Sequence, residues 1–195
     1  GYITYTTKVL FNSECDFGDL PFGYSNTALS NNGARHTSVN TNHIRLGTKI
    51  DYENDGFPTP GSTGDDEHNI ADEDGVAAYG NWSEGLNGGA FEVTVTGGSG
   101  FLSAWVDWNE DFDFLDAGEQ IFDMLPVIEG TQILTFDVPG GAIPSQGVFN
   151  DLARFRLAEN DTYTTTVTGL VQNGEVEDYY VEYASLTSLM VNTIY

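Results

Sequence analysis

The sequence predicts an all-β protein, an antiparallel β-sandwich with long loops between its strands. Short segments with apolar residues at every second position recur along the chain, and Gly, Pro, Asn and Asp bound them. Signals for helices are nearly absent. Hydrophobic residues make up 39% of the chain and aromatic residues 13%, which argues against disorder. A chain of 195 residues suits one hydrophobic core, so we expect a single domain over residues 1–195.

The predicted strands follow one another between these loops. Two weaker candidates come first, Tyr2–Phe11 and His43–Ile50. The tail after Tyr183 is either a last strand or the lead into a neighbouring module. The better candidates each have one apolar face at period two, and they are Phe91–Thr96, Phe101–Trp108, Gln132–Val138, Ala153–Ala158, Tyr163–Leu170 and Val176–Tyr183.

The overall charge restricts the possible partners and points to bound cations. The 30 acidic and 6 basic residues give a formal net charge of -24, which disfavours binding to nucleic acid or to anionic lipid. A halophile-like acidic shell is one interpretation, but it would scatter acids over every exposed face. Here the acids gather in short runs. We therefore favour bound metal ions.

The segment from Asp51 to Gly75 is the first of these acidic runs. It has almost no apolar residues and no periodicity, and it is too long for an ordinary loop. A flexible linker is the alternative, but repulsion would leave a linker extended, whereas cation binding explains why acids gather here. The expected metal ligands in this segment are Asp51, Glu53, Asp55, Asp65, Asp66, Asp72, Glu73 and Asp74.

The segment from Asp107 to Glu119 places oxygen-bearing side chains at alternate positions. Calcium takes about six to eight oxygen ligands, and loops of this spacing supply them. Phe112 stands where such loops prefer Gly, and strands flank the segment, so it is not an EF-hand. An ordinary acidic hairpin turn is the alternative, but it would not place like charges two residues apart. The expected ligands are Asp107, Asn109, Asp111, Asp113, Asp116 and Glu119.

Two further acids, Glu175 and Glu177, lie at the start of the last predicted strand. They are expected either to bind metal or to pair with Arg154 and Arg156. Ligand type favours calcium over magnesium, which retains more water, and over transition metals, which prefer His or Cys. We therefore expect more than one Ca²⁺ ion in the long loops of the sandwich.

Other features exclude several function classes. A single cysteine, Cys15, allows neither an internal disulfide nor a cysteine-based zinc site. The chain lacks the GxSxG and HExxH motifs, and although paired carboxylates can hydrolyse glycosides, calcium binding already accounts for them. We expect no enzymatic activity and no catalytic residues. No stretch is long enough for a transmembrane helix and no signal-peptide pattern begins the chain, so we expect an excised module.

Several short motifs occur together in one order: DFGDLP at Asp16–Pro21, NGARH at Asn32–His36, DEDGV at Asp72–Val76, then DWNEDFDFLDAGE, ARFRL and GEVEDYYV. In this order they resemble the GEVED domain, over about Asp16 to Tyr183. That family usually has Gly at the positions of Glu110 and Phe112, which differ here. The family occurs in secreted and cell-surface bacterial proteins, including large calcium-dependent adhesins.

The resemblance implies a calcium-dependent module, outside the cell, that binds a peptide or protein terminus on a target cell and mediates attachment or biofilm formation. The alternatives are a carbohydrate-binding module and a purely structural spacer stiffened by calcium. We expect the ligand at the Asp51–Asp74 loop, with Asp65 and Asp66 as ligand-facing chelators. Tyr79 and Trp82 are candidates for its wall, although aromatic residues are more often core residues.

Overall fold

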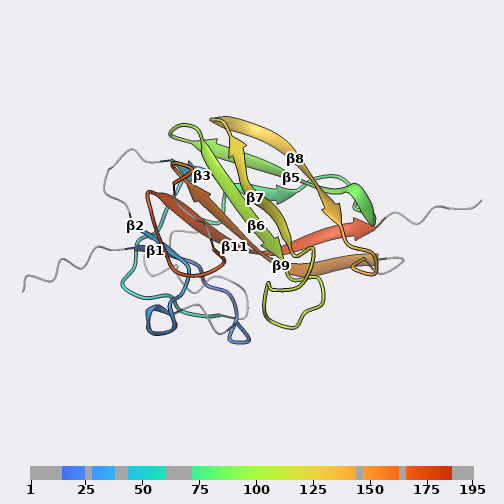
Figure 1. The fold of residues 1–195 in the computed structure, drawn as a ribbon, viewed down its shortest axis with the longest axis horizontal. Coiled ribbons are helices and arrows are strands. Elements are labelled where there is room, and N and C mark those ends of the chain that lie inside the picture. Colours follow the sequence, from blue (N-terminus) through green and yellow to red (C-terminus); the bar gives the residue numbers. More distant parts are fainter. Residues whose placement is uncertain are drawn as a thin grey trace, which may run out of the picture.

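The computed structural model describes residues 15–24, 28–37, 44–59, 72–143, 147–162 and 166–185 (Figure 1). This part of the chain is all-β, with one short 3-10 turn at Leu29–Asn31 and no α-helix. No helix in these ranges is long and apolar enough to cross a membrane. The strands are β1 Cys15–Phe17, β2 Arg35–Thr37, β3 Arg45–Leu46, β4 Val76–Ala78, β5 Gly85–Thr96, β6 Gly100–Val106, β7 Gln120–Val127, β8 Gly130–Val138, β9 Gly147–Ala158, β10 Leu170–Gln172 and β11 Gly174–Ser185.

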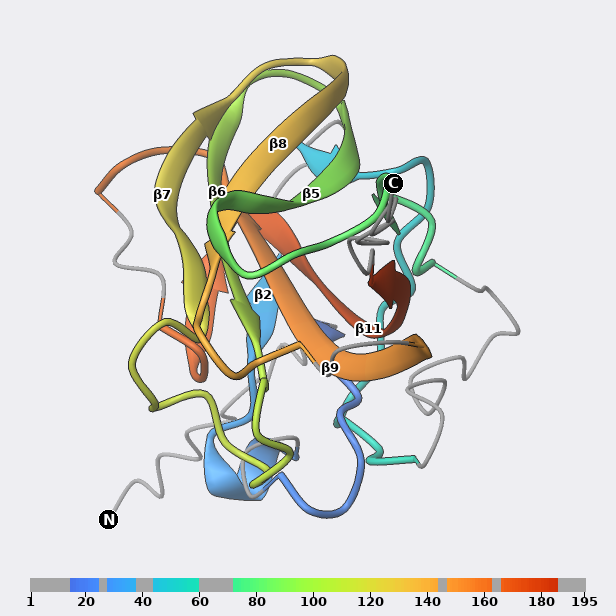
Figure 2. The same ribbon diagram turned by 90° about the vertical axis from the view of Figure 1, so that its right-hand side faces the viewer.

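Two antiparallel sheets form the sandwich. The first has the order β11-β9-β6-β7. The second is built around β5, which pairs with β8 along one edge and with β3 and then β4 along the other. Figure 2 shows β5 and β8 in front of β6, with β9 and β11 running below them. The predicted antiparallel sandwich is confirmed.

Aromatic side chains fill the space between these two sheets. Phe91 of β5 contacts Phe155 of β9 edge to face, with ring centroids 4.9 Å apart. Trp82 is fully buried and stacks on Tyr183 of β11 at 4.3 Å. Rings in these offset and edge-to-face arrangements add to the stabilisation gained from burial alone.

The central strand β9 is buried on both of its faces. Ala153, Phe155 and Leu157 face the sandwich core, whereas Arg154 and Arg156 face the opposite side. A third, three-stranded sheet of order β1-β2-β10 covers that side, with β2 and β10 parallel. The Arg156 guanidinium donates to the carbonyl of Arg35 in β2, so the two layers are joined by hydrogen bonds.

Five of the predicted strands correspond to β5, β6, β8, β9 and β11, although their ends differ. Only Arg45–Leu46 forms a strand within the predicted His43–Ile50. The prediction for Tyr163–Leu170 is wrong over residues 166–169, which form a loop before β10. Carbonyl groups of this loop accept hydrogen bonds from Arg154 and Arg156 instead of pairing with a strand. The candidate Tyr2–Phe11 and residues 163–165 lie outside the described residues.

Candidate metal centres

An interior group of carboxylates joins three segments that are distant in sequence. Asp16 lies in β1, Asp72 precedes β4 and Glu175 lies in β11. One oxygen atom from each lies within 4.8 Å of the others, and all three residues are buried. The sequence predicted Asp72 and Glu175 as ligands but did not predict Asp16, whose one signal was its place in the DFGDLP motif.

Backbone amides fix the position of each of these carboxylates. The amide of Val176 donates to Asp16 Oδ2 at 2.6 Å, and the amide of Asp51 donates to Asp72 Oδ2 at 2.7 Å. The amide of Leu46 donates to Glu175 Oε2 at 2.5 Å. The other oxygen, Glu175 Oε1, is buried without a hydrogen-bond partner. Amide donors favour the charged form of a carboxylate, so this group is arranged for negative charge.

Burial opposes that charge. It is the main cause that raises the pKa of Glu175 well above its ordinary value, and repulsion from Glu177 and Asp16 adds to it. Burial likewise raises the pKa of Glu177 to about 8, and burial with repulsion from Asp72 raises that of Glu73 to about 9. A cation among these groups would offset the cost of keeping them ionised.

The loop after β6 forms a second group. Asp107, Asp111 and Glu119 each offer an oxygen within 4.8 Å of the others, with Asp111 exposed and the other two buried. Asp107 Oδ2 accepts hydrogen bonds from the Phe112 amide at 3.0 Å and from the Tyr24 hydroxyl at 2.5 Å. Glu119 Oε2 accepts from the Asp116 amide, whereas its Oε1 is buried without a hydrogen-bond partner. Burial raises the pKa of Glu119 to about 7.

The backbone of this loop explains how it forms without the glycines typical of its motif. Glu110 has φ 57° and Phe112 has φ 71°, so both residues adopt the left-handed conformation that glycine favours. The Phe112 ring packs edge to face on Tyr24, with centroids 5.8 Å apart. That contact and the amide bond to Asp107 hold Phe112 in place at the cost of some backbone strain.

The remaining predicted ligands of this loop lie outside the second group. Asn109 donates to Asp116 Oδ2 at 2.6 Å, and Asp113 Oδ1 accepts from the Leu115 amide at 2.8 Å. These contacts shape the loop in the way that short polar side chains order turns.

Several predicted ligands in the Asp51–Gly75 segment also bind backbone amides. Glu53 Oε1 accepts from the Phe17 amide, and Asp55 Oδ1 accepts from the Leu29 amide. Asp74 accepts hydrogen bonds from the amide and hydroxyl of Thr48, with Lys49 at 3.9 Å. Asp65 and Asp66 lie outside the described residues, so their predicted roles rest on the sequence alone.

Strand register separates the acids of β11. Glu175 lies opposite Leu157 and Glu177 lies opposite Phe155. Both glutamates are therefore on the side of the sheet that faces the core, and Arg154 and Arg156 are on the other side. Asp178 lies opposite Arg154 and accepts two hydrogen bonds of 2.7 Å from its guanidinium. Arg156 donates to carbonyl groups and to His36 Nε2, and burial, with Arg154 nearby, lowers its pKa to about 9. The register therefore argues against pairing of Glu175 or Glu177 with either arginine.

The two aromatic residues predicted as a ligand wall lie in different environments. Tyr79 is half exposed, beside β4. Trp82 is fully buried in the sandwich core, where it contacts Phe91 and Phe136. It is a core residue, which leaves its predicted ligand contact without structural support.

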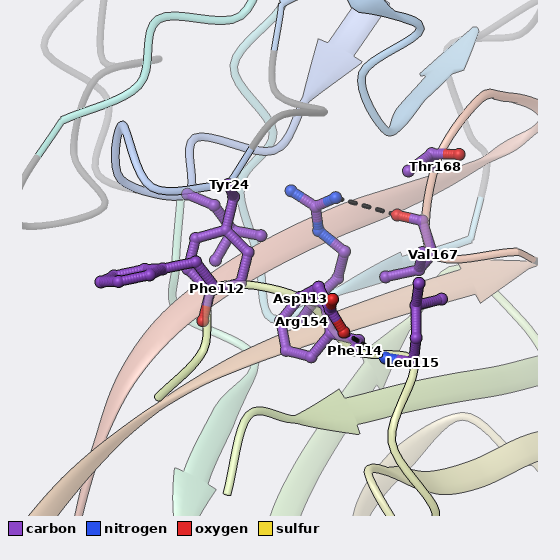
Figure 3. Close-up of a pocket in the computed structure, with 9 residues that line it drawn as sticks. Tyr24, Phe112, Asp113, Phe114, Leu115, Arg154, Val167 and Thr168 are labelled. Atoms are coloured by element: carbon purple, nitrogen blue, oxygen red, sulfur yellow. Dashed lines mark hydrogen bonds between the residues drawn. The ribbon is translucent and has the colours of Figure 1, made fainter. Parts of the chain in front are cut away.

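A cavity of about 160 Å³ adjoins the loop after β6 (Figure 3). Its walls are mostly apolar, and the figure shows Phe112 and Leu115 on opposite sides with Arg154 between them. Arg154 Nη1 donates to the carbonyl of Val167 at its edge. The Asp107 loop thus carries a carboxylate group and also part of the wall of a small pocket.

Comparison with known families shows that residues 101–182 match the family model of the GEVED domain. This range runs from β6 into β11 and includes the carboxylates of the Asp107 loop and Glu175. The resemblance read from the sequence motifs is confirmed over this range. Comparisons with curated proteins and with solved structures gave no match.

Proposed function

Because residues 101–182 match the GEVED domain, we propose that this chain is a calcium-dependent ligand-binding module of a bacterial cell-surface adhesin. It would act outside the cell, in attachment to host or other cells. Its proposed ligand is a peptide or protein terminus on the target cell. The observation that supports this most is the Asp107, Asp111 and Glu119 group, which combines two buried carboxylates with an exposed one.

The chemistry of this group suits calcium. All of its donor atoms are oxygens, and Glu119 Oε1 is buried with no hydrogen-bond partner in place. An ion bound there would have Asp111 on its solvent side, where a ligand carboxylate or hydroxyl group would complete its coordination. Through such an ion, a chain of net charge -24 can bind an anionic group.

The exposure of Asp111 also separates this proposal from a purely structural spacer. A spacer needs only ions that protein oxygens enclose completely, whereas a binding module needs one ion that is open to solvent. A carbohydrate remains the alternative ligand class, because calcium also binds vicinal hydroxyl groups.

Calcium titration of the metal-free 195-residue chain tests the loop site. We expect Asp111→Asn to remove one calcium equivalent in isothermal titration calorimetry, since the site loses a charged ligand. Asp123→Asn, at an exposed position in β7, is the matched control and should keep all equivalents. An unchanged stoichiometry in Asp111→Asn would place the ion elsewhere.

Ligand class is tested separately with arrays of immobilised peptides and glycans, probed in calcium and again in excess chelator. Capture by peptides in calcium alone supports the proposal. Calcium-dependent capture by glycans alone would reassign the ligand, and capture that persists in chelator would overturn the calcium dependence.

A further inference from the structure

We propose that Asp16, Asp72 and Glu175 form a second, fully enclosed cation site that fastens the three-stranded sheet to the sandwich. This site differs from the loop site in that none of its three ligands is exposed to solvent. Its ion would bind no external ligand. The class of ion is a hard divalent cation, with calcium as the best fit.

The first argument is the state of Glu175. Its side chain is fully buried, it offers one oxygen to the carboxylate group, and its Oε1 has no hydrogen-bond partner. The Leu46 amide holds Oε2, so the carboxylate cannot rotate to use both oxygens elsewhere without losing that bond. Leaving a buried acceptor of this kind unsatisfied is costly, and a cation would remove the cost.

The second argument distinguishes a cation from protons. Each of the three carboxylates accepts a backbone amide bond, from Val176, Asp51 and Leu46 respectively. Amide donors stabilise ionised carboxylates and offer nothing to a carboxylic acid proton, which itself needs an acceptor. The surroundings are therefore built for negative charge, which a cation neutralises.

The third argument concerns the kind of cation. The donor atoms are all carboxylate oxygens, which excludes ions that require thiolate or imidazole ligands. Magnesium retains several of its waters, whereas calcium accepts a site built largely from protein oxygens. A buried site of three carboxylates therefore favours calcium over magnesium.

The position of the site assigns it a structural role. It connects β1 of the three-stranded sheet, the segment before β4 of the β5 sheet, and β11 of the four-stranded sheet. An ion there ties all three sheets together. Because the site is enclosed, the ion should leave only when the surrounding structure opens, so its release should be slow.

Release kinetics of the calcium-loaded 195-residue chain test this proposal. On mixing with a fluorescent chelator, we expect a fast phase from the loop ion and a second phase at least tenfold slower. Asp16→Asn should abolish the slow phase and spare the fast one, because Asn keeps an oxygen to accept the Val176 amide. Asp111→Asn should do the reverse, and Asp123→Asn should change neither.

A measurement on the unaltered protein guards against variants that fail to fold. After a brief chelator pulse and desalting, a native mass spectrum should show one retained calcium ion. A spectrum without retained calcium overturns the proposal. So does a slow phase that persists in both Asp16→Asn and Glu175→Gln. Loss of the slow phase alone leaves the loop site and the proposed function intact, so the two can fail independently.

Discussion

Acids on the two faces of β11 have different roles because alternate residues of a strand face opposite sides. On one face, Glu175 joins the interior carboxylate group and Glu177 Oε1 accepts hydrogen bonds from the amides of Asp74 and Gly75. Asp178 faces the other way and pairs with Arg154. The glycine before them, Gly174, has φ 150°, and a Cβ there would lie 1.8 Å from the Leu157 carbonyl oxygen. In the GEVED motif, the glycine, the two glutamates and the aspartate are therefore each needed for a separate reason.

Replacing Asp178 tests the buried ion pair with Arg154. Asp178→Asn leaves a buried guanidinium without its charged partner, since both side chains are almost completely buried. Breaking such a pair costs about 3–5 kcal/mol. We expect that loss in the free energy of unfolding, measured with urea in saturating calcium. Glu182→Gln, at an exposed position of the same strand, should change stability by about 0.5 kcal/mol at most. Equal effects of the two would contradict the assignment.

Asp151 provides a pH-dependent prediction beside the loop after β6, where repulsion from Glu110 and Asp107 adds to the effect of burial on its pKa. Its side chain accepts the Tyr183 hydroxyl at 2.6 Å, and burial raises its pKa from 3.8 to about 6. The folded state therefore binds a proton more tightly than the unfolded state, and this proton's contribution to stability is lost as pH rises from about 4 to 6. Asp151→Asn should be more stable than the parent by about 3 kcal/mol above pH 6. The difference should vanish near pH 4 in urea unfolding, and a difference independent of pH would refute the assignment.

At the scale of elements, the strands that the sequence revealed are those with one uninterrupted apolar face. β5 and β8 show this alternation clearly. β7 escaped prediction because Met124 adopts φ 49° and the register with β6 shifts nearby, which breaks the period of two. Residues 166–169 were wrongly predicted as a strand for another reason. Their backbone carbonyls accept hydrogen bonds from buried arginines of a distant strand, β9, instead of pairing with a neighbouring strand. No local pattern encodes either effect.

The loop after β6 offers an element-scale prediction about backbone strain. Glu110 is exposed and left-handed, a conformation that costs non-glycine residues about 1–2 kcal/mol. Glu110→Gly should therefore raise the free energy of unfolding by about 0.5 kcal/mol, after the added flexibility of glycine is subtracted. Glu129→Gly, at an exposed position outside the left-handed region, should lower it by a similar amount. Urea unfolding in calcium compares them, and a loss in both variants would show that the loop carries no such strain.

At the scale of the whole molecule, buried acids greatly outnumber buried bases among the described residues. The buried bases are Arg154 and Arg156, with His36, whose pKa burial holds well below its ordinary value. The buried acids are Asp16, Asp19, Asp51, Glu53, Asp72, Asp107, Glu119, Asp151, Glu175, Glu177 and Asp178. A fold of this kind should depend on bound cations.

Removing calcium should therefore lower the melting temperature of the whole chain. Two sites that each hold calcium at about 100 times its dissociation constant contribute about 5 kcal/mol together. At this chain length that corresponds to a shift of about 10–20 °C in calorimetry. Chelator already saturated with calcium is the control. An unchanged melting temperature would refute calcium dependence, and full recovery in 1 M NaCl with chelator (roughly a 3 Å screening length) would indicate general charge screening instead.

Prediction from the sequence works best where the structure is local. The candidate ligands Asp107, Asp111 and Glu119 lie in one short segment, so their spacing alone indicated that their side chains would lie close together. The interior group has one member from each of three sheets or their edges, and only the folded topology places Asp16 beside Glu175. Asp72 and Glu175 were found as acids in suggestive motifs, but nothing in their spacing identified their common partner.

The hydrogen bond from Val176 to Asp16 spans 160 positions of the chain, and it has a consequence for the order of assembly. β1 is among the first described strands to be made and β11 is the last. During synthesis or export in chain order, the interior carboxylates therefore cannot meet until nearly the whole module is available. A chain cut before β11 can pair many of its strands, but it can never assemble this group. Cation binding by the interior group would then require that β11 has already been made.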